Sequence, residues 1–201
     1  ILAVLDGLGI ERAHIVGLSM GAFATFYFAM KWPQRALSIT LAGIGSGSMA
    51  ASRAQFKEEA LSNADDLLRE GWVQGAERRA VTPTRVQLLN KSPRAFAEFI
   101  GLLRQHSALG SANTLRGYQA LRPSLSDFAA EMAACTVPAL IVSGDEDEPC
   151  LDASLMLKRA MPSAGLVFLP QTGHACNLEE PDLFNAACER FFHQVESGQY
   201  R

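Results

Sequence analysis

The 201 residues suffice for one domain with a sizeable core and a subdomain, and a content of 48% hydrophobic and 19% charged residues excludes an intrinsically disordered chain. The net charge of −3, with both signs interspersed, gives no indication of a nucleic-acid partner or an anionic membrane surface. The longest strongly apolar run, residues 22–30, is far shorter than the roughly 20 residues that span a bilayer, so no membrane partner is expected.

The beginning of the sequence alternates between helical and strand patterns. Residues 1–8 carry leucines at helical spacing and end at Gly9, which predicts the second half of an amphipathic helix. Residues 14–18 predict a strand, and residues 36–42 predict the next one. Between them, residues 20–31 are apolar nearly all round, so we expect a helix that is buried on every side.

A glycine-rich run, Gly43 to Ser48, follows the second strand pattern. It differs from a dinucleotide-binding fingerprint because Ser48 replaces the third glycine and no clear βαβ unit follows. We interpret it as a flexible connection that leaves the sheet.

Strand patterns disappear between residues 52 and 132. Because they resume directly afterwards, we expect a helical cap inserted between two strands rather than a separate helical domain, and caps of this kind shape the substrate pocket. The helical patterns cover residues 53–69, 71–79, 94–105, 111–120 and 125–133. The candidate lining residues, most of which we expect in the cap's own core, are Phe56, Trp72, Phe96, Phe99, Leu102, Leu103, His106 and Tyr118.

The end of the sequence returns to alternating strands and helices. The near-continuous apolar run at residues 137–143 predicts a strand covered on both faces, as in a parallel sheet. A helix at 151–160, a strand at 165–169 and a last helix at 181–195 follow. This order predicts an α/β protein with a parallel doubly wound sheet. Its expected parts are a core segment at 1–48, the cap at 49–133 and a second core segment at 134–201.

A serine lies between two glycines at the end of the first strand pattern, in the run Gly17-Leu18-Ser19-Met20-Gly21. A strand before it and a helix after it are typical of a nucleophile elbow, a turn so sharp that the flanking glycine positions must lack bulk. The backbone N–H of Met20 is expected at the N-terminus of the following helix. Developing negative charge is stabilised there, so this N–H is a candidate oxyanion-hole donor.

Two further polar groups follow strand patterns: a carboxylate of the turn 145–147 and the imidazole of His174. The carboxyl ends of parallel strands meet at one edge of a sheet, so we expect both groups close to Ser19. A histidine can remove the proton of a serine hydroxyl, and a buried carboxylate can fix the histidine's tautomer.

The order serine, carboxylate, histidine along a chain is that of the alpha/beta hydrolases. The sequence resembles this family over its whole length, and the cap is the least specific part of the resemblance. The motifs that carry it are Gly17 to Gly21, Gly144 to Asp147 after an apolar strand, and Gly173-His174 followed by Asn177 to Pro181 and Phe184-Asn185.

The resemblance implies roles for individual residues. Ser19 would be the nucleophile and His174 the general base. The family usually places its acid three residues after the strand-ending glycine, which favours Asp147 over Asp145. Asp145 and Glu146 are then expected as solvated turn residues.

The remaining acidic, cysteine and histidine residues indicate no second kind of site. Glu179 and Glu180, which precede Pro181, are interpreted as charges at a helix N-terminus. The four cysteines lack CxxC spacing and the histidines lack HExxH spacing, so neither a metal nor a cofactor is expected. Cys176, two residues from His174, is expected to be buried or to line the site.

The first residue of this sequence, Ile1, corresponds to a position within the family's pattern, in the helix before the elbow strand. The family's earlier strands are absent, together with the loop that supplies the second oxyanion N–H, so we expect a partial sequence of a longer protein. The elbow strand would then have an unpaired apolar edge. Loss of one oxyanion donor costs about 10²–10³ in rate, so weak or no activity is expected of these residues alone.

Together these features predict a serine hydrolase that cleaves a carboxylic ester, lactone or related carbonyl compound through an acyl-enzyme. Serine at the elbow argues against dehalogenases and epoxide hydrolases, whereas carbon–carbon bond hydrolysis, perhydrolysis and acyl transfer stay open. A noncatalytic ligand-binding protein and an inactive fragment are the alternatives. The expected substrate is a small, partly hydrophobic molecule and the expected location cytoplasmic, with reduced cysteines. The oligomeric state is not indicated.

Overall fold

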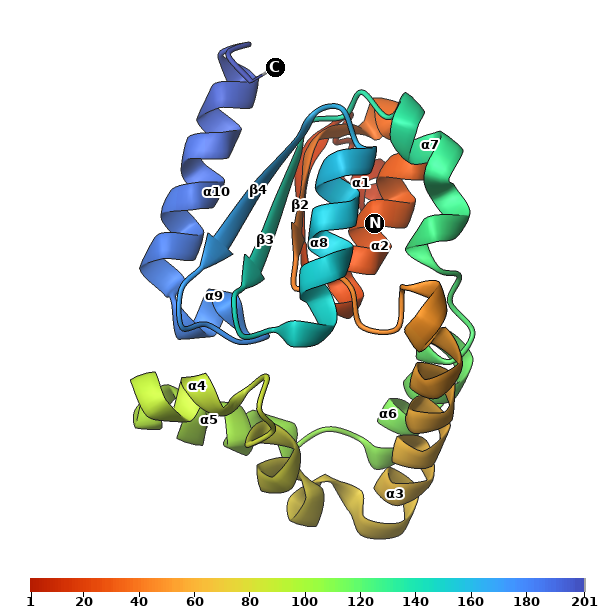
Figure 1. Cartoon of the computed structure of the whole chain (residues 1–201), viewed down its shortest axis with the longest axis vertical. Coiled ribbons are helices and arrows are strands. Elements are labelled where there is room, and N and C mark those ends of the chain that lie inside the picture. The colour runs from red at the N-terminus through yellow and green to blue at the C-terminus, as the bar shows by residue number, and fades with distance from the viewer. Residues whose placement is uncertain (201) are drawn as a thin grey trace. The chain divides into compact units, whose positions relative to one another are not determined.

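The computed structural model describes residues 1–200, which divide into two compact units (Figure 1). The core unit consists of residues 1–45 and of the described residues from 128 onward, and the helical unit consists of residues 46–127. The chain enters the helical unit after the second strand and returns from it before the third. Residues 129–133, which the sequence assigned to the inserted segment, belong to the core unit, where helix α7 (Ala129–Ala134) packs against helix α8 (Glu148–Ala160).

Within residues 1–200, one parallel sheet of four strands forms the centre of the core unit, in the order β1-β2-β3-β4. The register pairs Leu18 with Ala42, Ala42 with Val142 and Gly144 with Leu169, so the strands end side by side. Every residue of β3 is buried, as its apolar run predicted. The expected parallel α/β architecture is confirmed. The strands are β1 (Ala13–Leu18), β2 (Ala36–Ala42), β3 (Ala139–Gly144) and β4 (Ala164–Leu169).

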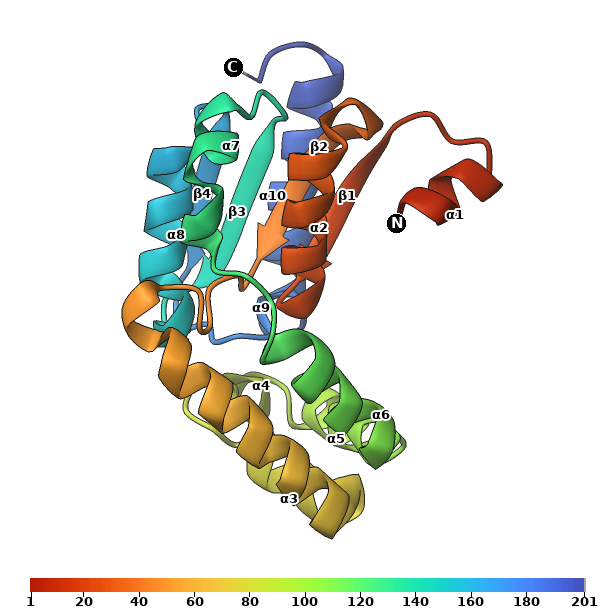
Figure 2. The same cartoon turned by 90° about the vertical axis from the view of Figure 1, so that its right-hand side faces the viewer.

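Helices cover both faces of the sheet, as in a doubly wound fold (Figures 1 and 2). Helices α2 (Met20–Lys31) and α8 lie on one face, and α10 (Pro181–Glu196) lies on the other. The buried residues on the α10 face are Ala42, Leu140, Val142, Leu169, Cys176, Phe184, Cys188 and Phe191. The core unit also contains α1 (Leu2–Gly7), α9 (Cys176–Glu179) and a 3₁₀ turn at Pro33–Arg35, and a further 3₁₀ turn, Leu125–Phe128, leads into α7.

The elbow strand and its helix differ in part from expectation. Helix α2 is largely buried, but Ala24 is exposed and the side chain of Met20 is 42% exposed, so the helix is not covered on every side. Among the described residues β1 pairs only with β2, and Val16 on this strand is 47% exposed. The strand that precedes Ser19 is therefore an edge strand of the described sheet.

The helical unit contains four α-helices among the described residues. Its longest helix bends at Gly71, whose φ of 69° and ψ of 178° are not helical, where the sequence patterns predicted two separate helices. Ala76, Ala80 and Ile100 form a buried cluster, and four of the candidate lining residues (Trp72, Phe96, Phe99 and Leu103) pack against it. The elements are a 3₁₀ turn (Ala50–Ser52), α3 (Arg53–Ala80), α4 (Val86–Lys91), α5 (Pro93–Leu103), α6 (Ala108–Thr114) and a π-helical turn (Leu115–Gln119).

The start of the helical unit is held by a buried arginine. Arg122 donates hydrogen bonds to the carbonyl oxygen of Ser46 and to the hydroxyl of Ser48, and its guanidinium lies 4.8 Å from the ring centre of Phe56. A Cβ on Gly47 would lie 2.1 Å from Cγ of the same phenylalanine. The glycine run is thus a closely packed connection, and its expected flexibility stays a prediction.

No helix within residues 1–200 combines the length and the apolar character needed to cross a membrane.

Candidate active site

The turn after β1 holds Ser19 in an unusual backbone conformation. Ser19 occupies the N-cap position of α2 with φ 55° and ψ −115°, a region that residues with a side chain rarely adopt. Its backbone N–H donates to the carbonyl of Ala42 at the end of β2, 2.8 Å away. The sharp turn therefore leaves the serine at the carboxyl edge of the sheet, as the elbow pattern predicted.

The two glycines of the elbow are not equivalent. A Cβ on Gly17 would lie 2.2 Å from the carbonyl oxygen of Gly21 and 2.6 Å from Oγ1 of Thr25, so only glycine fits where the strand meets the helix. A Cβ on Gly21 would meet no described atom within 4 Å. The crowding that the elbow pattern predicts is thus found at Gly17, whereas the described residues leave room for a Cβ at Gly21.

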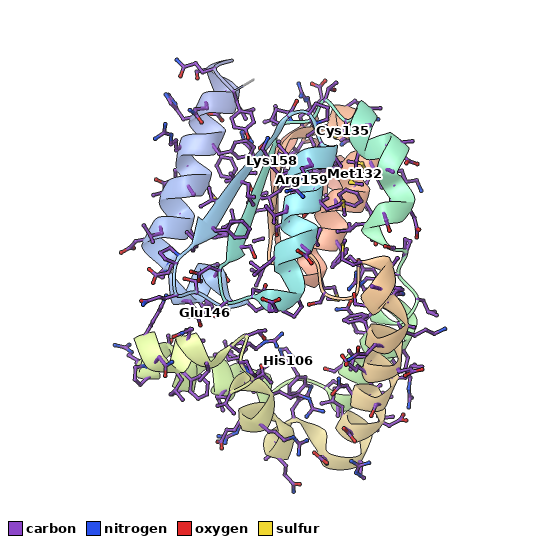
Figure 3. All side chains as sticks on the ribbon, viewed as in Figure 1. His106, Met132, Cys135, Glu146, Lys158 and Arg159 are labelled. Carbon is purple, nitrogen blue, oxygen red and sulfur yellow. The ribbon has the colours of Figure 1, made fainter. Side chains whose placement is uncertain are left out.

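The loop after β3 is locked to the loop after β4. A Cβ on Gly144 would lie 2.0 Å from the carbonyl oxygen of Thr172, so the two loops touch through their backbones. The backbone N–H of Glu146 donates to that same oxygen at 2.9 Å, and the carboxylate of Asp145 accepts the N–H of Thr172 at 3.1 Å. Asp145 and Glu146 are exposed, and Figure 3 shows Glu146 in this loop, with Lys158 and Arg159 near the other end of α8.

Asp147, His174 and Ser19 are joined by two hydrogen bonds. Nδ1 of His174 lies 2.8 Å from Oδ2 of Asp147, and Nε2 lies 2.8 Å from Oγ of Ser19. An ionised carboxylate only accepts hydrogen bonds, so Nδ1 carries the proton and Nε2 is left to accept from the serine hydroxyl. Asp147 is 1% and His174 7% exposed. The structure thus brings together the three side chains that the sequence selected from three strand ends.

The backbone amide of Met20 occupies the first position of α2, next to the serine. The first amides of a helix have no acceptor inside the helix and carry partial positive charge. This is the position of the predicted oxyanion donor.

A buried glutamate holds the loop that carries the histidine. Glu179 is 4% exposed, and its two carboxylate oxygens accept the backbone N–H groups of Gly173 and Ala175, the neighbours of His174. Its interpretation as a charge at a helix N-terminus is therefore wrong, whereas Glu180 does occupy the N-cap of α10. The sequence carried no signal for this role, because the contact depends on the tight turn of α9.

Two thiols are buried near the same side chains. The thiol of Cys150, in the first turn of α8, lies 3.4 Å from the carbonyl oxygen of Gly43. Burial raises the pKa of the Cys176 thiol to about 12, helped by the nearby carboxylates of Glu179 and Asp147. Cys176 is thus a buried, protonated thiol under ordinary conditions.

Asp147, Cys150 and His174 form a cluster of possible metal ligands. Each offers one ligand atom, these atoms lie within 4.8 Å of one another, and all three residues are buried. No spacing motif in the sequence indicated such a cluster, because the sheet topology, not local spacing, brings the histidine to the start of α8.

Comparisons with known proteins identify the family of this chain. A sequence model of the alpha/beta hydrolase family matches residues 1–187. A Klebsiella pneumoniae protein named for carbamate hydrolysis, RutD, is 31% identical over 92% of this chain. A 2-hydroxy-6-oxononadienedioate/2-hydroxy-6-oxononatrienedioate hydrolase from Pseudomonas putida is 28% identical over 90% of the chain.

The solved structures give the same fold. The enol-lactonase from Burkholderia xenovorans LB400 superposes with a TM-score of 0.81 at 23% identity, covering 96% of this chain and 70% of the enzyme. The chain spans 67% of the length of RutD and 63% of the length of the P. putida hydrolase.

Proposed function

This chain belongs to the alpha/beta hydrolase family, and we propose that it cleaves a carboxylic ester, lactone or related carbonyl substrate through an acyl-enzyme. The observation that carries this function is the pair of 2.8 Å hydrogen bonds that joins Ser19, His174 and Asp147. Serine would be the nucleophile, histidine the general base and aspartate the group that orients the base.

The reaction would proceed in two halves. Oγ of Ser19 bonds to the carbonyl carbon while its proton passes to Nε2 of His174. The bond to the leaving oxygen then breaks, and that oxygen takes the proton from Nε2. Water adds to the acyl-serine in the same way, giving its proton to Nε2, and the serine recovers a proton as the acid leaves. Asp147 stays ionised throughout, and the N–H of Met20 donates to the carbonyl oxygen as it becomes negative.

The substrate class is supported by the names of the relatives. RutD is named for a carbamate, the P. putida hydrolase for an oxo-dienedioate and the B. xenovorans enzyme for an enol-lactone. All three names describe small carbonyl compounds. The helical unit, which the chain forms between β2 and β3, would be the cap that sets selectivity, and the apolar composition of this segment favours a partly hydrophobic acyl group.

A second candidate function is hydrolysis next to a ketone. It is favoured by the P. putida relative, whose named substrate carries a 6-oxo group rather than an ester. The same serine and histidine would serve both reactions, so a substrate panel has to contain esters, lactones and oxo-dienoates.

Intact mass after treatment with a fluorophosphonate tests the proposed mechanism. We expect one adduct on the parent protein and none on Ser19→Ala. Ser143→Ala is the matched control, because Ser143 is also buried at the end of a strand but bonds only to the carbonyl of Gly144, 3.3 Å away, in the described contacts. A folded parent protein without an adduct would mean that the site formed by these residues is incomplete or noncatalytic.

A further inference from the structure

We propose that Asp147, Cys150 and His174 form a binding site for a thiophilic divalent cation such as Zn²⁺ or Cd²⁺, and that the bound ion switches the hydrolase off. The switching part of this inference rests on the proposed function, whereas the binding part does not. The cluster combines a carboxylate, a thiol and an imidazole, which are the three ligand types that zinc prefers in proteins.

The positions of the three side chains follow from the fold. Asp147 is the N-cap residue of α8, Cys150 lies in the first turn of the same helix, and His174 comes from the loop after β4. Their ligand atoms lie within 4.8 Å of one another. Metal bonds of about 2.0–2.3 Å to N, O and S require ligand atoms between 3 and 4 Å apart, so small side-chain movements are sufficient.

The thiol of Cys150 lies beside the backbone of Gly43. Its hydrogen bond to the carbonyl oxygen of Gly43 is weak, because the sulfur–oxygen distance is 3.4 Å. A Cβ on Gly43 would lie 3.4 Å from Nδ1 of His174, so this glycine, the thiol and the imidazole already pack together. Rotation about the Cα–Cβ bond of Cys150 changes the position of the sulfur without moving the backbone.

Charge balance makes the thiol important. On binding, the Cys150 thiol would release its proton to solvent, and the thiolate and the Asp147 carboxylate would together neutralise a divalent cation beside a neutral imidazole. All three residues are buried, and a net charge in a buried site is costly. A hydroxyl in place of the thiol would leave the complex with one positive charge, so we expect serine at position 150 to abolish binding.

Metal binding would remove the general base by changing its tautomer. The ion bonds to Nδ1 of His174 in place of the proton that is hydrogen-bonded to Asp147, and the imidazole then carries its proton on Nε2. That nitrogen no longer has a lone pair for the hydroxyl of Ser19, so the serine is not activated. No covalent bond of the chain changes, and a chelator would restore the original tautomer.

Cd²⁺ added to the chelator-treated protein tests binding directly, through the ultraviolet charge-transfer band of a cadmium–thiolate bond. We expect the band in the parent protein and in Cys135→Ser, and its loss in Cys150→Ser. Cys135 is a buried thiol directly after α7, and Figure 3 shows it far from the loop that carries Glu146. Absence of the band from the parent, or its persistence in a folded Cys150→Ser, would overturn the proposed site. If Cys150→Ser fails to fold, Cys150→Ala replaces it.

The rate of fluorophosphonate labelling at Ser19, with and without Cd²⁺, tests the switch. We expect Cd²⁺ to slow labelling of the parent and of Cys135→Ser at least tenfold, with recovery after chelation. For Cys150→Ser, the labelling rate with Cd²⁺ should stay nearly equal to the labelling rate without it. If the charge-transfer band forms but the rate of labelling does not change, the metal site is supported and the proposed inhibition of the hydrolase is overturned. A parent that is never labelled would contradict the proposed hydrolase mechanism instead, and the band would still decide the metal site.

Discussion

The carboxylate of Asp145 accepts the backbone N–H of Thr172 at 3.1 Å, two residues before the histidine. The carboxylate that accepts the hydrogen bond from Nδ1 of His174 belongs to Asp147, two residues further on. Two aspartates of the same turn thus have different structural roles. Asp145 ties the loop after β3 to the loop after β4, and Asp147 fixes the orientation of the imidazole.

Replacing each aspartate by asparagine should separate these roles. In Asp147→Asn the amide can donate to Nδ1, which favours the wrong imidazole tautomer, and kcat should fall by a factor on the order of 10⁴. In Asp145→Asn the side-chain oxygen still accepts from Thr172, so kcat should stay within about tenfold of the parent value. Steady-state kinetics on an activated ester measure both effects.

The two variants serve as each other's control, because they change the same group in the same turn. A large loss of kcat in Asp145→Asn together with a small loss in Asp147→Asn would show that the acid has been assigned to the wrong residue.

The sequence predicted the elements of this site better than its contacts. Ser19 and His174 follow strand patterns, and the carboxyl ends of parallel strands meet at one edge, so their proximity followed from topology alone. The choice between the two aspartates needed the family resemblance, because both follow the same strand. Helices α4 and α9 were missed, since helices of four to six residues are too short to show a clear hydrophobic period.

Contacts that depend on side chains reaching between loops were also not predictable. The carboxylate of Glu179 binds backbone amides, which leave no trace in the sequence. The thiol of Cys150 comes near His174 only because α8 begins beside the loop after β4. Arg122 holds the start of the helical unit although 76 residues separate it from Ser46.

Glu179→Gln should impair the chemical step by loosening the histidine loop. The amide retains one acceptor oxygen, so one of the N–H groups of Gly173 and Ala175 loses its partner. A misplacement of the imidazole by about 1 Å can cost on the order of 10² in rate, and we expect kcat to fall by up to this factor with little change in KM. We would divide each measured rate by the concentration of active sites, determined by titration. The resulting kcat reports the effect of a misplaced imidazole separately from any loss of folded protein.

Glu180→Gln provides the comparison for this variant. It removes a charge next to the first turn of α10, which is worth about 0.3–1 kcal/mol, and should leave kcat near the parent value. If both variants lose thermal stability but neither loses kcat per active site, the role of Glu179 is structural only.

Gly17→Ala should destabilise the protein and disrupt the elbow. The new Cβ would lie 2.2 Å from the carbonyl oxygen of Gly21, and a backbone atom cannot rotate away as a side chain can. We expect a loss at or above the upper end of the about 1–3 kcal/mol typical of overpacking, measured by denaturant unfolding. The rate of fluorophosphonate labelling at Ser19 should fall as well.

Gly101→Ala is the matched control for added bulk, because a Cβ there meets no described atom within 4 Å and the residue lies inside α5. Alanine should stabilise this helix by up to about 1 kcal/mol. Equal stability of Gly17→Ala and the parent protein would contradict the close approach of strand and helix at the elbow.

Tyr200→Phe should change how stability depends on alkaline pH. The hydroxyl of Tyr200 donates to the carbonyl of Ala139 at the start of β3, 3.0 Å away, and burial raises the pKa of this phenol above its ordinary value of 10. The unfolded chain loses its phenolic proton at lower pH than the folded chain. The stabilisation by this group is therefore fully present below about pH 10 and is lost as the pH rises through the raised folded value.

Thermal melts of both proteins between neutral pH and pH 11 measure this effect. At neutral pH the parent should be more stable than Tyr200→Phe by about 1 kcal/mol, the usual net contribution of one hydrogen bond, and the difference should shrink or reverse above pH 10. Tyr118→Phe is the comparison, since burial also raises the pKa of Tyr118 but its hydroxyl has no partner among the described residues. It should lose no stability at neutral pH. A difference between parent and Tyr200→Phe that stays constant up to pH 11 would show that the phenol titrates alike in the folded and unfolded chains.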